Sequence, residues 1–168
     1  LFLAGTLSPL YGIYSGFELY ENVPVREGSE EYLDSEKYQV RARDWRAPGN
    51  LDPDITALNR VRRAEPALQA MTNLSFHPAG HPDVLLYLKA AWGRDLLCAV
   101  SVNPQEPVTA ELEVPLERLG LDDATPFEVE DLLTGERLVW QGARQPVRFD
   151  PSERAGYLWR VVRSGGGG

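Results

Sequence analysis

VLLYLKAAWGRDLLCAVSVN, residues 84–103, contains two apolar runs on either side of the turn-forming sequence WGRD. Both runs are rich in aliphatic and β-branched residues, which fit the pleated, half-buried surface of a sheet. Short runs of this type that are bounded by turn signals are typical of strands. The stretch therefore predicts that this part of the chain is built from β-strands.

The rest of the C-terminal half has the same pattern. Turn signals of the NPQE, LTGE and DPSE type separate five more β-rich runs: VTAELEVP, FEVEDLLTG, RLVWQG, PVRFD and YLWRVVR. In VTAELEV, alternate residues fall on one face of the expected strand: Val108, Ala110, Leu112 and Val114. LERLGL, residues 116–121, is expected to form a short helical turn between strands. The pattern predicts an all-β antiparallel sandwich over residues 72–163, followed by a flexible Gly-rich tail at 164–168.

The N-terminal part, residues 1–71, has a mixed α/β pattern. Residues 1–9 predict the end of a helix, and LYGIYSGFEL, residues 10–19, predicts a short buried strand. Residues 20–50 form a long loop, and loops of this length in compact domains are usually functional or disordered. These elements are too few to close a core alone, and the chain starts with apolar residues and without Met. We therefore expect a fragment of a longer protein.

A helix is predicted directly after the loop. Asp52 is the expected N-cap and Pro53 suits the first helical position. Three apolar residues lie at helical spacing: Ile55, Leu58 and Val61. Three arginines fall outside this apolar stripe: Arg60, Arg62 and Arg63. Pro66 is expected to end or kink the helix, with one further turn over residues 67–71.

The charge and cysteine content exclude several classes of protein. The formal net charge is −8 and no basic face is present, which argues against nucleic acid or an anionic membrane as a partner. The single cysteine, Cys98, rules out an internal disulfide framework and is expected to be a buried thiol. No stretch has the roughly 20 apolar residues of a membrane span, and no signal peptide is present. We expect a cytoplasmic location.

Few residues in the chain match a metal or nucleophile motif. His77 and His81 are spaced H-x-x-x-H, but the prolines and glycine around them preclude a metal-binding helix. No nucleophile elbow, phosphate-binding loop or dinucleotide fingerprint is present. We therefore expect no metal site and no cofactor. Of the four Trp residues, three lie in β-rich runs and are expected in the core, although an exposed one could serve as a platform for sugar.

The long loop carries the most suggestive chemical groups. Residues 21–36 of the loop hold six carboxylates, and a solvated charged surface accounts for most of them: Glu21, Glu27, Glu30, Glu31, Asp34 and Glu36. Their spacing matches no calcium-binding loop. Lys37 and Tyr38 stand out, because hydrogen-bond donors lie beside aromatic faces there and Arg41, Arg43 and Trp45 follow. Sugars are bound by such a combination of polar groups and flat apolar surfaces.

The order of elements resembles the α-amylase family, glycoside hydrolase family 13. LAGTLSPLYGIYSGFELYE, residues 3–21, resembles the family's last βα barrel unit, and ITALNRVRRAEPAL, residues 55–68, resembles the last barrel helix. ENVPVREGSEEYLDSEKYQVRARDW, residues 21–45, looks like one subfamily, the α-1,4-glucan:maltose-1-phosphate maltosyltransferases. The resemblance implies that residues 1–71 are the end of a TIM barrel and that its last active-site loop, 20–50, precedes a C-terminal β-sandwich.

The resemblance also carries expectations about chemistry. Such enzymes transfer maltose from maltose 1-phosphate to the non-reducing end of an α-glucan, with retention and release of phosphate. Their catalytic Asp and Glu lie on earlier barrel strands, so we assign no catalytic residue in this chain and expect the chain alone to be inactive. By resemblance, Lys37 and Tyr38 of the EKYQ motif contact the donor maltose, and the enzyme is a cytoplasmic homodimer. Two alternatives stay open: another amylase-family enzyme such as a trehalose synthase or α-amylase, and a non-catalytic glucan-binding sandwich.

Overall fold

The computed structural model describes residues 1–33, 40–91 and 93–162. The chain divides into two compact units, one made of Leu1–Leu10 together with Leu58–Gly168 and the other of Tyr11–Ala57. We call the first the sheet unit and the second the loop unit. The predicted boundary between a barrel piece and a sandwich near residue 72 concerns the parent protein and stays a prediction.

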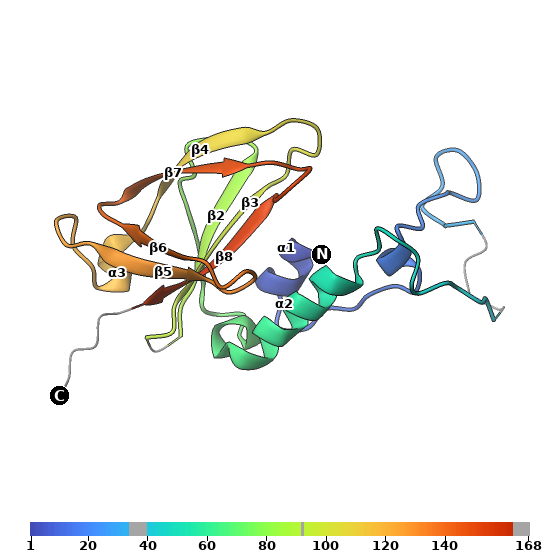
Figure 1. Ribbon diagram of the computed structural model, residues 1–168, viewed down its shortest axis with the longest axis horizontal. Coiled ribbons are helices and arrows are strands. Elements are labelled where there is room, and N and C mark those ends of the chain that lie inside the picture. The colour runs from blue at the N-terminus through green and yellow to red at the C-terminus, as the bar shows by residue number, and fades with distance from the viewer. Residues whose placement is uncertain (34–39, 92, 163–168) are drawn as a thin grey trace. The chain divides into compact units, whose positions relative to one another are not determined.

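The sheet unit is built mainly from antiparallel strands (Figure 1). Its strands are β1 (Leu74–His77), β2 (Val84–Lys89), β3 (Leu96–Ser101), β4 (Val108–Glu113), β5 (Phe127–Asp131), β6 (Arg137–Trp140), β7 (Arg144–Phe149) and β8 (Gly156–Val162). The larger sheet has the order β1-β2-β3-β8-β5-β6, and β4 pairs with β7 in a smaller sheet. A short helix, α3 (Leu116–Leu119), follows β4.

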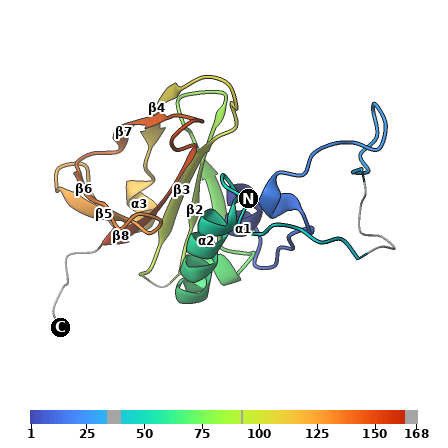
Figure 2. The same cartoon turned by 45° about the vertical axis from the view of Figure 1, so that its right-hand side comes forward.

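One hydrophobic core lies between the two sheets, so that this part of the chain is a sandwich (Figures 1 and 2). Buried and exposed residues alternate along β4, because only one face of this strand meets the larger sheet. The aromatic residues of β6 and β8 fill the centre of the core. Trp159 stacks on Tyr157 with a ring separation of 4.8 Å and meets Trp140 edge-on at 4.9 Å. The predicted antiparallel sandwich is confirmed.

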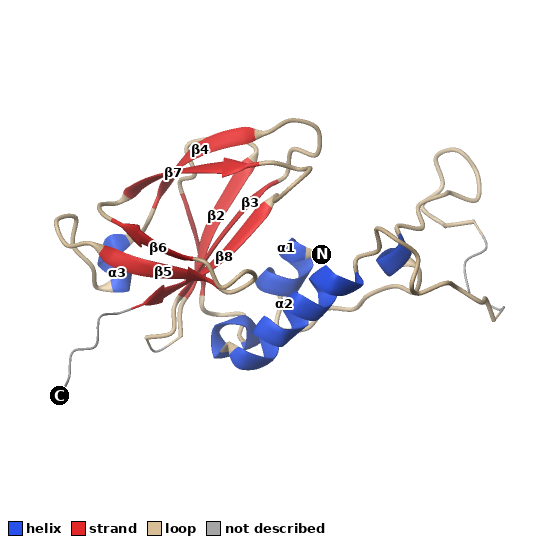
Figure 3. Ribbon diagram, viewed as in Figure 1, coloured by secondary structure: helices blue, strands red, loops and turns tan. Residues whose placement is uncertain are grey.

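Helical elements cover the other face of the larger sheet (Figure 3). They are α1 (Phe2–Leu7), the 3₁₀ turn η2 (Pro66–Gln69) and the part of α2 (Asp52–Ala64) from Leu58 onwards. Leu58, Val61 and Leu68 pack there against residues of β2, β3 and β8, including Tyr87 and Cys98. Both faces of β2 and β3 are covered, so buried and exposed residues do not alternate along these strands. Their sequences are therefore mostly apolar from end to end.

Three buried polar side chains connect these helical elements to one another and to the sheet. Lys89 is fully buried, and its ammonium donates to the backbone carbonyl of Ala70 at 2.7 Å. Burial holds the pKa of Lys89 below its ordinary value. The hydroxyls of Thr6 and Tyr87 lie 2.5 Å apart and share a hydrogen bond. Each of these groups therefore has a partner, as buried polar atoms require.

Arg62 closes the C-terminal end of α1. Its guanidinium donates to the backbone carbonyl oxygens of Gly5, Ser8 at 3.0 Å and Pro9 at 2.7 Å. The last carbonyls of a helix lack partners within the helix, and a cation is favourable beside them. The sequence placed Arg62 outside the apolar stripe of its own helix, and the structure assigns it this capping contact.

The loop unit contains little regular structure. Its described residues hold the short 3₁₀ turn η1 (Phe17–Leu19) and an isolated bridge between Pro24 and Tyr32, before α2 begins. The buried strand predicted over residues 10–19 is therefore wrong. No neighbouring strand pairs with this segment in the described part of the chain, and a strand depends on such pairing. Gly16, with φ of +102°, and Tyr20, with φ of +56°, turn the chain instead.

The other local predictions are largely confirmed. All seven predicted β-rich runs contain a strand, and the turn at 116–121 contains α3. The short strand β1 was not predicted.

α2 ends before Glu65, and η2 supplies the further turn. The helix begins at Asp52, whose backbone N–H donates to the Asn50 side chain at 3.0 Å, so Asp52 is the first helical residue and not the N-cap.

Candidate functional site

The long loop folds back on itself near its start. The backbone N–H of Val25 donates to the carbonyl of Glu31 at 2.8 Å, and that of Leu33 donates to Val23 at 2.7 Å. These bonds surround the Pro24–Tyr32 bridge. The Tyr32 ring meets the ring of Tyr14 edge-on at 6.2 Å. Residues 23–33 thus form a narrow, hairpin-like turn.

Glu21 and Arg43 form a two-pronged ion pair among the described residues of the loop unit. Arg43 Nε donates to Glu21 Oε1 at 2.9 Å, and Arg43 Nη2 donates to Glu21 Oε2 at 3.1 Å. The third nitrogen, Nη1, donates to the Ser15 hydroxyl at 3.2 Å. This two-pronged geometry is the strong form of an arginine–carboxylate pair. We call these three residues, Ser15, Glu21 and Arg43, the loop clamp.

The environment of the loop clamp differs from that of a surface ion pair. Only 2% of the Arg43 side chain is exposed, and 24% of that of Glu21. The hydrogen bonds from Arg43 lower the pKa of the Glu21 carboxyl below its ordinary value, although burial opposes them, and the charge of Arg41 acts in the same direction. The Arg41 guanidinium lies 3.5 Å from Glu21 Oε2. Glu21 is therefore an ionised, partnered group, an exception among carboxylates of which most were expected on a solvated surface.

Gly16 makes room for the carboxylate. The backbone N–H of Glu21 donates to the carbonyl of Gly16 at 3.1 Å, which brings the two residues together. A Cβ at position 16 would lie 2.3 Å from Glu21 Oε2. The positive φ of Gly16 is also one that other residues rarely adopt. A small side chain here would therefore displace the carboxylate.

A small hollow adjoins the clamp. It has a volume of about 100 Å³ and is lined by Glu21, Asn22, Val23, Tyr32, Leu33 and Arg41. Pockets that enclose a small-molecule ligand usually have roughly 300 Å³ or more. The hollow alone is thus too small for a disaccharide. Arg43 also lies over the half-exposed ring of Trp45, 5.9 Å from its centroid.

The two predicted sugar contacts, Lys37 and Tyr38, lie outside the described residues, as do the acids Asp34 and Glu36. Their assignment stays a prediction. The structure does describe the two segments that lead to them, which meet at the loop clamp. The sequence suggested Arg43 only as a general hydrogen-bond donor. The contact between positions 21 and 43 has no short-range sequence signal, because it connects residues 22 positions apart.

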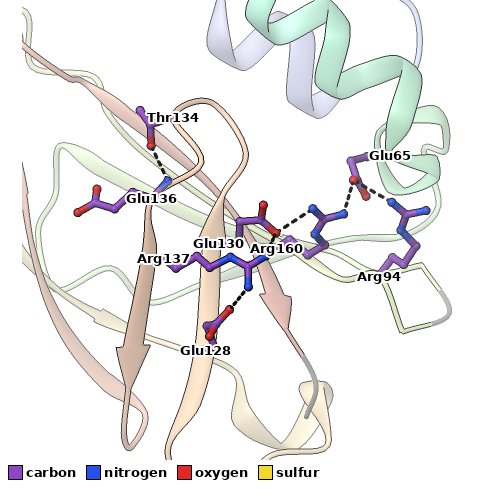
Figure 4. A network of polar contacts seen from close by, with 8 residues as sticks. All are labelled: Glu65, Arg94, Glu128, Glu130, Thr134, Glu136, Arg137 and Arg160. Carbon is purple, nitrogen blue, oxygen red and sulfur yellow. Dashed lines mark hydrogen bonds and ion pairs between the residues drawn. The ribbon is translucent and has the colours of Figure 1, made fainter. Parts of the chain in front are cut away.

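A second charged cluster lies in the sheet unit (Figure 4). Glu65 Oε1 accepts hydrogen bonds from Arg94 at 3.1 Å and from Arg160 at 3.0 Å. Arg160 also donates to Glu130 at 2.9 Å, and the contacts continue through Arg137 to Glu128. A hollow of about 390 Å³ lies beside them, between α2 and the turn after β5. None of its described lining residues is aromatic, so it lacks the flat apolar surface that favours sugars. The cluster's cations and carboxylates are paired with one another, which supports a structural role.

The remaining candidates also have structural partners. The His77 ring contacts the Ser75 hydroxyl at 3.0 Å, and His81 Nδ1 accepts from the backbone N–H of Asp83 at 3.1 Å. Within the described residues, no group of three or more His, Cys, Asp or Glu is placed to hold a metal ion. Cys98 is buried, as predicted, and burial raises the pKa of its thiol.

The tryptophans divide between the two units. Trp140 and Trp159 are buried in the core, as the β-rich runs predicted, whereas Trp45 is exposed and Trp92 lies outside the described residues.

No helix in the described part of the chain has both the length and the apolar character to cross a bilayer.

Comparison with known proteins identifies close relatives. The chain is 43% identical over 165 residues to α-1,4-glucan:maltose-1-phosphate maltosyltransferase 1 of Streptomyces coelicolor. It is 44% identical over 163 residues to the enzyme of the same name from Pseudomonas aeruginosa. Each match covers 96% of this chain but only 24% of the relative, so the chain spans about a quarter of the length of these proteins.

Solved structures support the same fold at lower identity. The maltogenic α-amylase AmyB of Thermotoga neapolitana matches with a TM-score of 0.63 over 96% of this chain and 35% of its own, at 14% identity. An α-amylase from Anoxybacillus matches with a TM-score of 0.54 over 80% of this chain and 27% of its own, at 15% identity. At this identity the likeness concerns the fold alone.

A family model gives the assignment directly. Residues 76–161, which begin within β1 and end within β8, match the model described as "GLGE, C-terminal". This match covers more than half of the chain and coincides with the antiparallel sandwich. The chain therefore belongs to the GLGE C-terminal family.

Proposed function

We propose that this chain is the C-terminal part of an α-1,4-glucan:maltose-1-phosphate maltosyltransferase. The observation that carries the proposal is the identity of more than 40% to enzymes of that name over nearly the whole chain. Because the match covers 96% of the chain, it includes the loop unit as well as the sheet unit. The parent enzyme would transfer maltosyl units from maltose 1-phosphate to the non-reducing end of an α-1,4-glucan and release phosphate.

The proposed chemistry is a retaining double displacement. An Asp nucleophile attacks the donor and forms a glycosyl-enzyme, and a Glu serves first as acid and then as base. Both residues belong to the part of the parent that precedes this chain. Residues 1–71 would supply the end of its (β/α)₈ barrel, whose active site is formed by loops at one face. Residues 72–163 would be the C-terminal sandwich.

Within the chain, we assign Lys37 and Tyr38 to the donor maltose. The charged and aromatic composition of their loop supports this assignment, since donors and flat rings together suit sugar hydroxyls and faces. The loop clamp connects the two segments that enter and leave that part of the loop. No metal or cofactor is part of the proposal. The parent is proposed to be a cytoplasmic homodimer.

The purified full-length parent provides the test. We expect phosphate release from maltose 1-phosphate only when glycogen is present, with the α-glucan chains lengthened by two glucose units. Maltose without phosphate is the control donor and should give no extension. The absence of phosphate release would contradict the proposal, and efficient conversion of maltose would favour the trehalose synthase alternative.

The isolated 168-residue chain should release no phosphate under the same conditions, because the nucleophile is supplied elsewhere. Turnover by this chain would show that the catalytic groups are among its own residues. Sedimentation of the chain with glycogen tests the remaining alternative, a glucan-binding sandwich. The buried positions of Trp140 and Trp159 make that alternative less favourable, because neither ring can face a sugar.

A further inference from the structure

The hollow beside the charged cluster of the sheet unit has the size of a ligand site. Its volume is about 390 Å³, and pockets that hold small molecules have roughly 300–1,000 Å³. Its walls come from the end of α2, the turn before β3, β5 with its following turn, and β8. Six charged side chains line it: Arg60, Glu65, Arg94, Glu130, Asp131 and Arg160. Charge and hydrogen bonding therefore decide what it can hold.

Three of these side chains are fixed by contacts within the walls. Asp131 accepts a hydrogen bond from Arg154. Arg160 donates to Glu65 at 3.0 Å and to Glu130 at 2.9 Å. These parts of the walls are therefore ordered before a ligand arrives, and such preorganisation reduces the entropy cost of binding.

Glu65 has a buried oxygen that lacks a donor. The residue is 2% exposed, and its Oε1 accepts from Arg94 at 3.1 Å and from Arg160 at 3.0 Å. Figure 4 shows both guanidinium groups directed at this carboxylate. The second oxygen, Oε2, is also buried and has no hydrogen-bond partner in the described part of the chain. A buried acceptor without a donor costs free energy, so Oε2 requires a donor from outside the walls.

Two arginines of the same walls have spare donors. Arg60 is exposed, and its side chain makes no hydrogen bond or ion pair with the described residues. Arg94 is half-exposed, and its side chain makes one hydrogen bond to the described residues, to Glu65. A guanidinium carries five N–H donors in a planar fork that matches the oxygens of an oxyanion. The hollow therefore combines donors for an anion with an acceptor that needs a proton.

We propose that the hollow binds an oxyanion that still carries a proton, with inorganic hydrogen phosphate as the simplest example. The O–H of the ion donates to Glu65 Oε2, and its charged oxygens accept from Arg60 and Arg94. The half-exposed Arg94 side chain is the part of the wall that moves to admit the ion to Glu65. This inference goes beyond the proposed function, because none of these residues is assigned to maltosyl transfer.

The buried carboxylate gives the site a selectivity that arginines alone lack. Sulfate has the shape and charge of hydrogen phosphate but no proton at neutral pH, so one of its oxygens would be repelled by the negative Oε2 of Glu65. A phosphate monoester has a second pKa of about 6, so it has also lost most of its proton at pH 7.5. Hydrogen phosphate keeps one proton at this pH and can satisfy the carboxylate.

Equilibrium dialysis of the 168-residue chain with radiolabelled phosphate measures the binding directly, at pH 7.5 and constant ionic strength. This chain contains the whole hollow and lacks the part of the parent to which we assign catalysis. We expect saturation at one phosphate per chain. Radiolabelled sulfate should bind about 10-fold more weakly, the equivalent of one hydrogen bond to a charged group. Unlabelled glycerol phosphate should compete for the site as poorly as sulfate does.

Two variants test whether the ion lies in the hollow. Glu65→Gln keeps the shape and removes the charge, and it should lower phosphate affinity by about 10-fold without lowering sulfate affinity. Arg60→Gln changes an exposed side chain and should weaken the binding of both anions to the same degree. Arg63→Gln changes an exposed arginine of the same helix that does not line the hollow, so it is the matched control and should bind as wild type. The thermal midpoint of each variant shows that the measured chain is folded.

Three outcomes would contradict the phosphate site. The absence of saturable phosphate binding by the folded chain would show that water supplies the donor to Glu65, and would overturn the proposal. Equal affinity for phosphate and sulfate would also overturn it, as would phosphate binding that is unchanged in both Glu65→Gln and Arg60→Gln. None of these outcomes depends on transferase activity, so the proposed function is tested separately by phosphate release from the parent.

Discussion

The sheet unit and the loop unit are stabilised by different interactions. In the sheet unit, both faces of β2 and β3 are covered, and Leu97 and Cys98 are fully buried. In the loop unit, Tyr14 is 53% exposed and Trp45 is 44% exposed, and turns and the loop clamp order the backbone. Apolar burial stabilises a fold in proportion to the area removed from water, and the exposed rings of the loop unit contribute little of it. Substitutions in the sheet unit should therefore change the stability of the fold, and those in the loop unit should mainly change function.

The largest contrast is expected between two tryptophans. Trp159→Ala removes a ring that is 1% exposed and packs against two other aromatic rings, and it should lower the free energy of unfolding by about 3–5 kcal/mol. Trp45→Ala should change it by less than about 0.5 kcal/mol. Urea unfolding of the 168-residue chain, followed by far-ultraviolet circular dichroism, measures both. Equal losses for the two variants would show that the loop unit depends on burial as much as the sheet unit does.

A smaller effect is expected from a polar contact inside the sheet unit. Arg62→Ala removes the donor of three carbonyl contacts at the end of α1 and should destabilise the fold by about 1.5–3 kcal/mol. Arg63→Ala, at an exposed neighbouring position of the same helix, is the control and should be nearly neutral. The same urea titration tests this, and limited proteolysis near the N-terminus should become faster for Arg62→Ala alone. Identical behaviour of the two variants would remove the capping role.

The smallest expected effect is a change of the unfolding free energy with pH, which depends on the burial of Cys98 in the sheet unit. Burial raises the pKa of the Cys98 thiol in the folded chain. The thiol therefore stays neutral in the folded chain at pH values at which it ionises in the unfolded chain. The stabilisation from this group is therefore present below the unfolded pKa and is lost as pH rises above about 9. The difference in unfolding free energy between wild type and Cys98→Ala should fall by about 1.4 kcal/mol per pH unit in that range.

Cys98 is the single cysteine of the chain, so a thiol reagent checks this prediction independently. Labelling of the folded chain should be slow and should accelerate only with unfolding. A flat difference curve between pH 8 and 10, or fast labelling of the folded chain, would show that water reaches the thiol.

The elements that could be predicted from the sequence lie mainly in the sheet unit. Strand β4 was predicted because its alternation reflects one buried face, and β2 and β3 because their aliphatic runs reflect two. Strand β1 was missed because it has only four residues and an exposed Phe76 at a sheet edge. Local patterns thus sufficed wherever burial decided the structure.

The loop unit shows where local patterns are insufficient. Residues 10–19 have the aromatic composition of a strand, but propensity of this type depends on neighbouring strands, and none pairs with them in the described chain. Glu21 and Arg43 meet over 22 positions of sequence, so neither residue type nor spacing could predict their contact. The role of Gly16, whose missing side chain leaves room for the Glu21 carboxylate, is visible only in the structure.

The order of strands in the larger sheet has a consequence for solubility. Its outermost strands, β1 and β6, have four residues each, whereas the strands between them have five to seven. An outermost strand presents unpaired backbone donors and acceptors that can recruit another chain, and short edges limit this recruitment. Pro78 directly follows β1 and cannot donate a backbone hydrogen bond. The sheet therefore ends in two edges that are too short to serve as a template for aggregation, even though Val139 on β6 is 72% exposed.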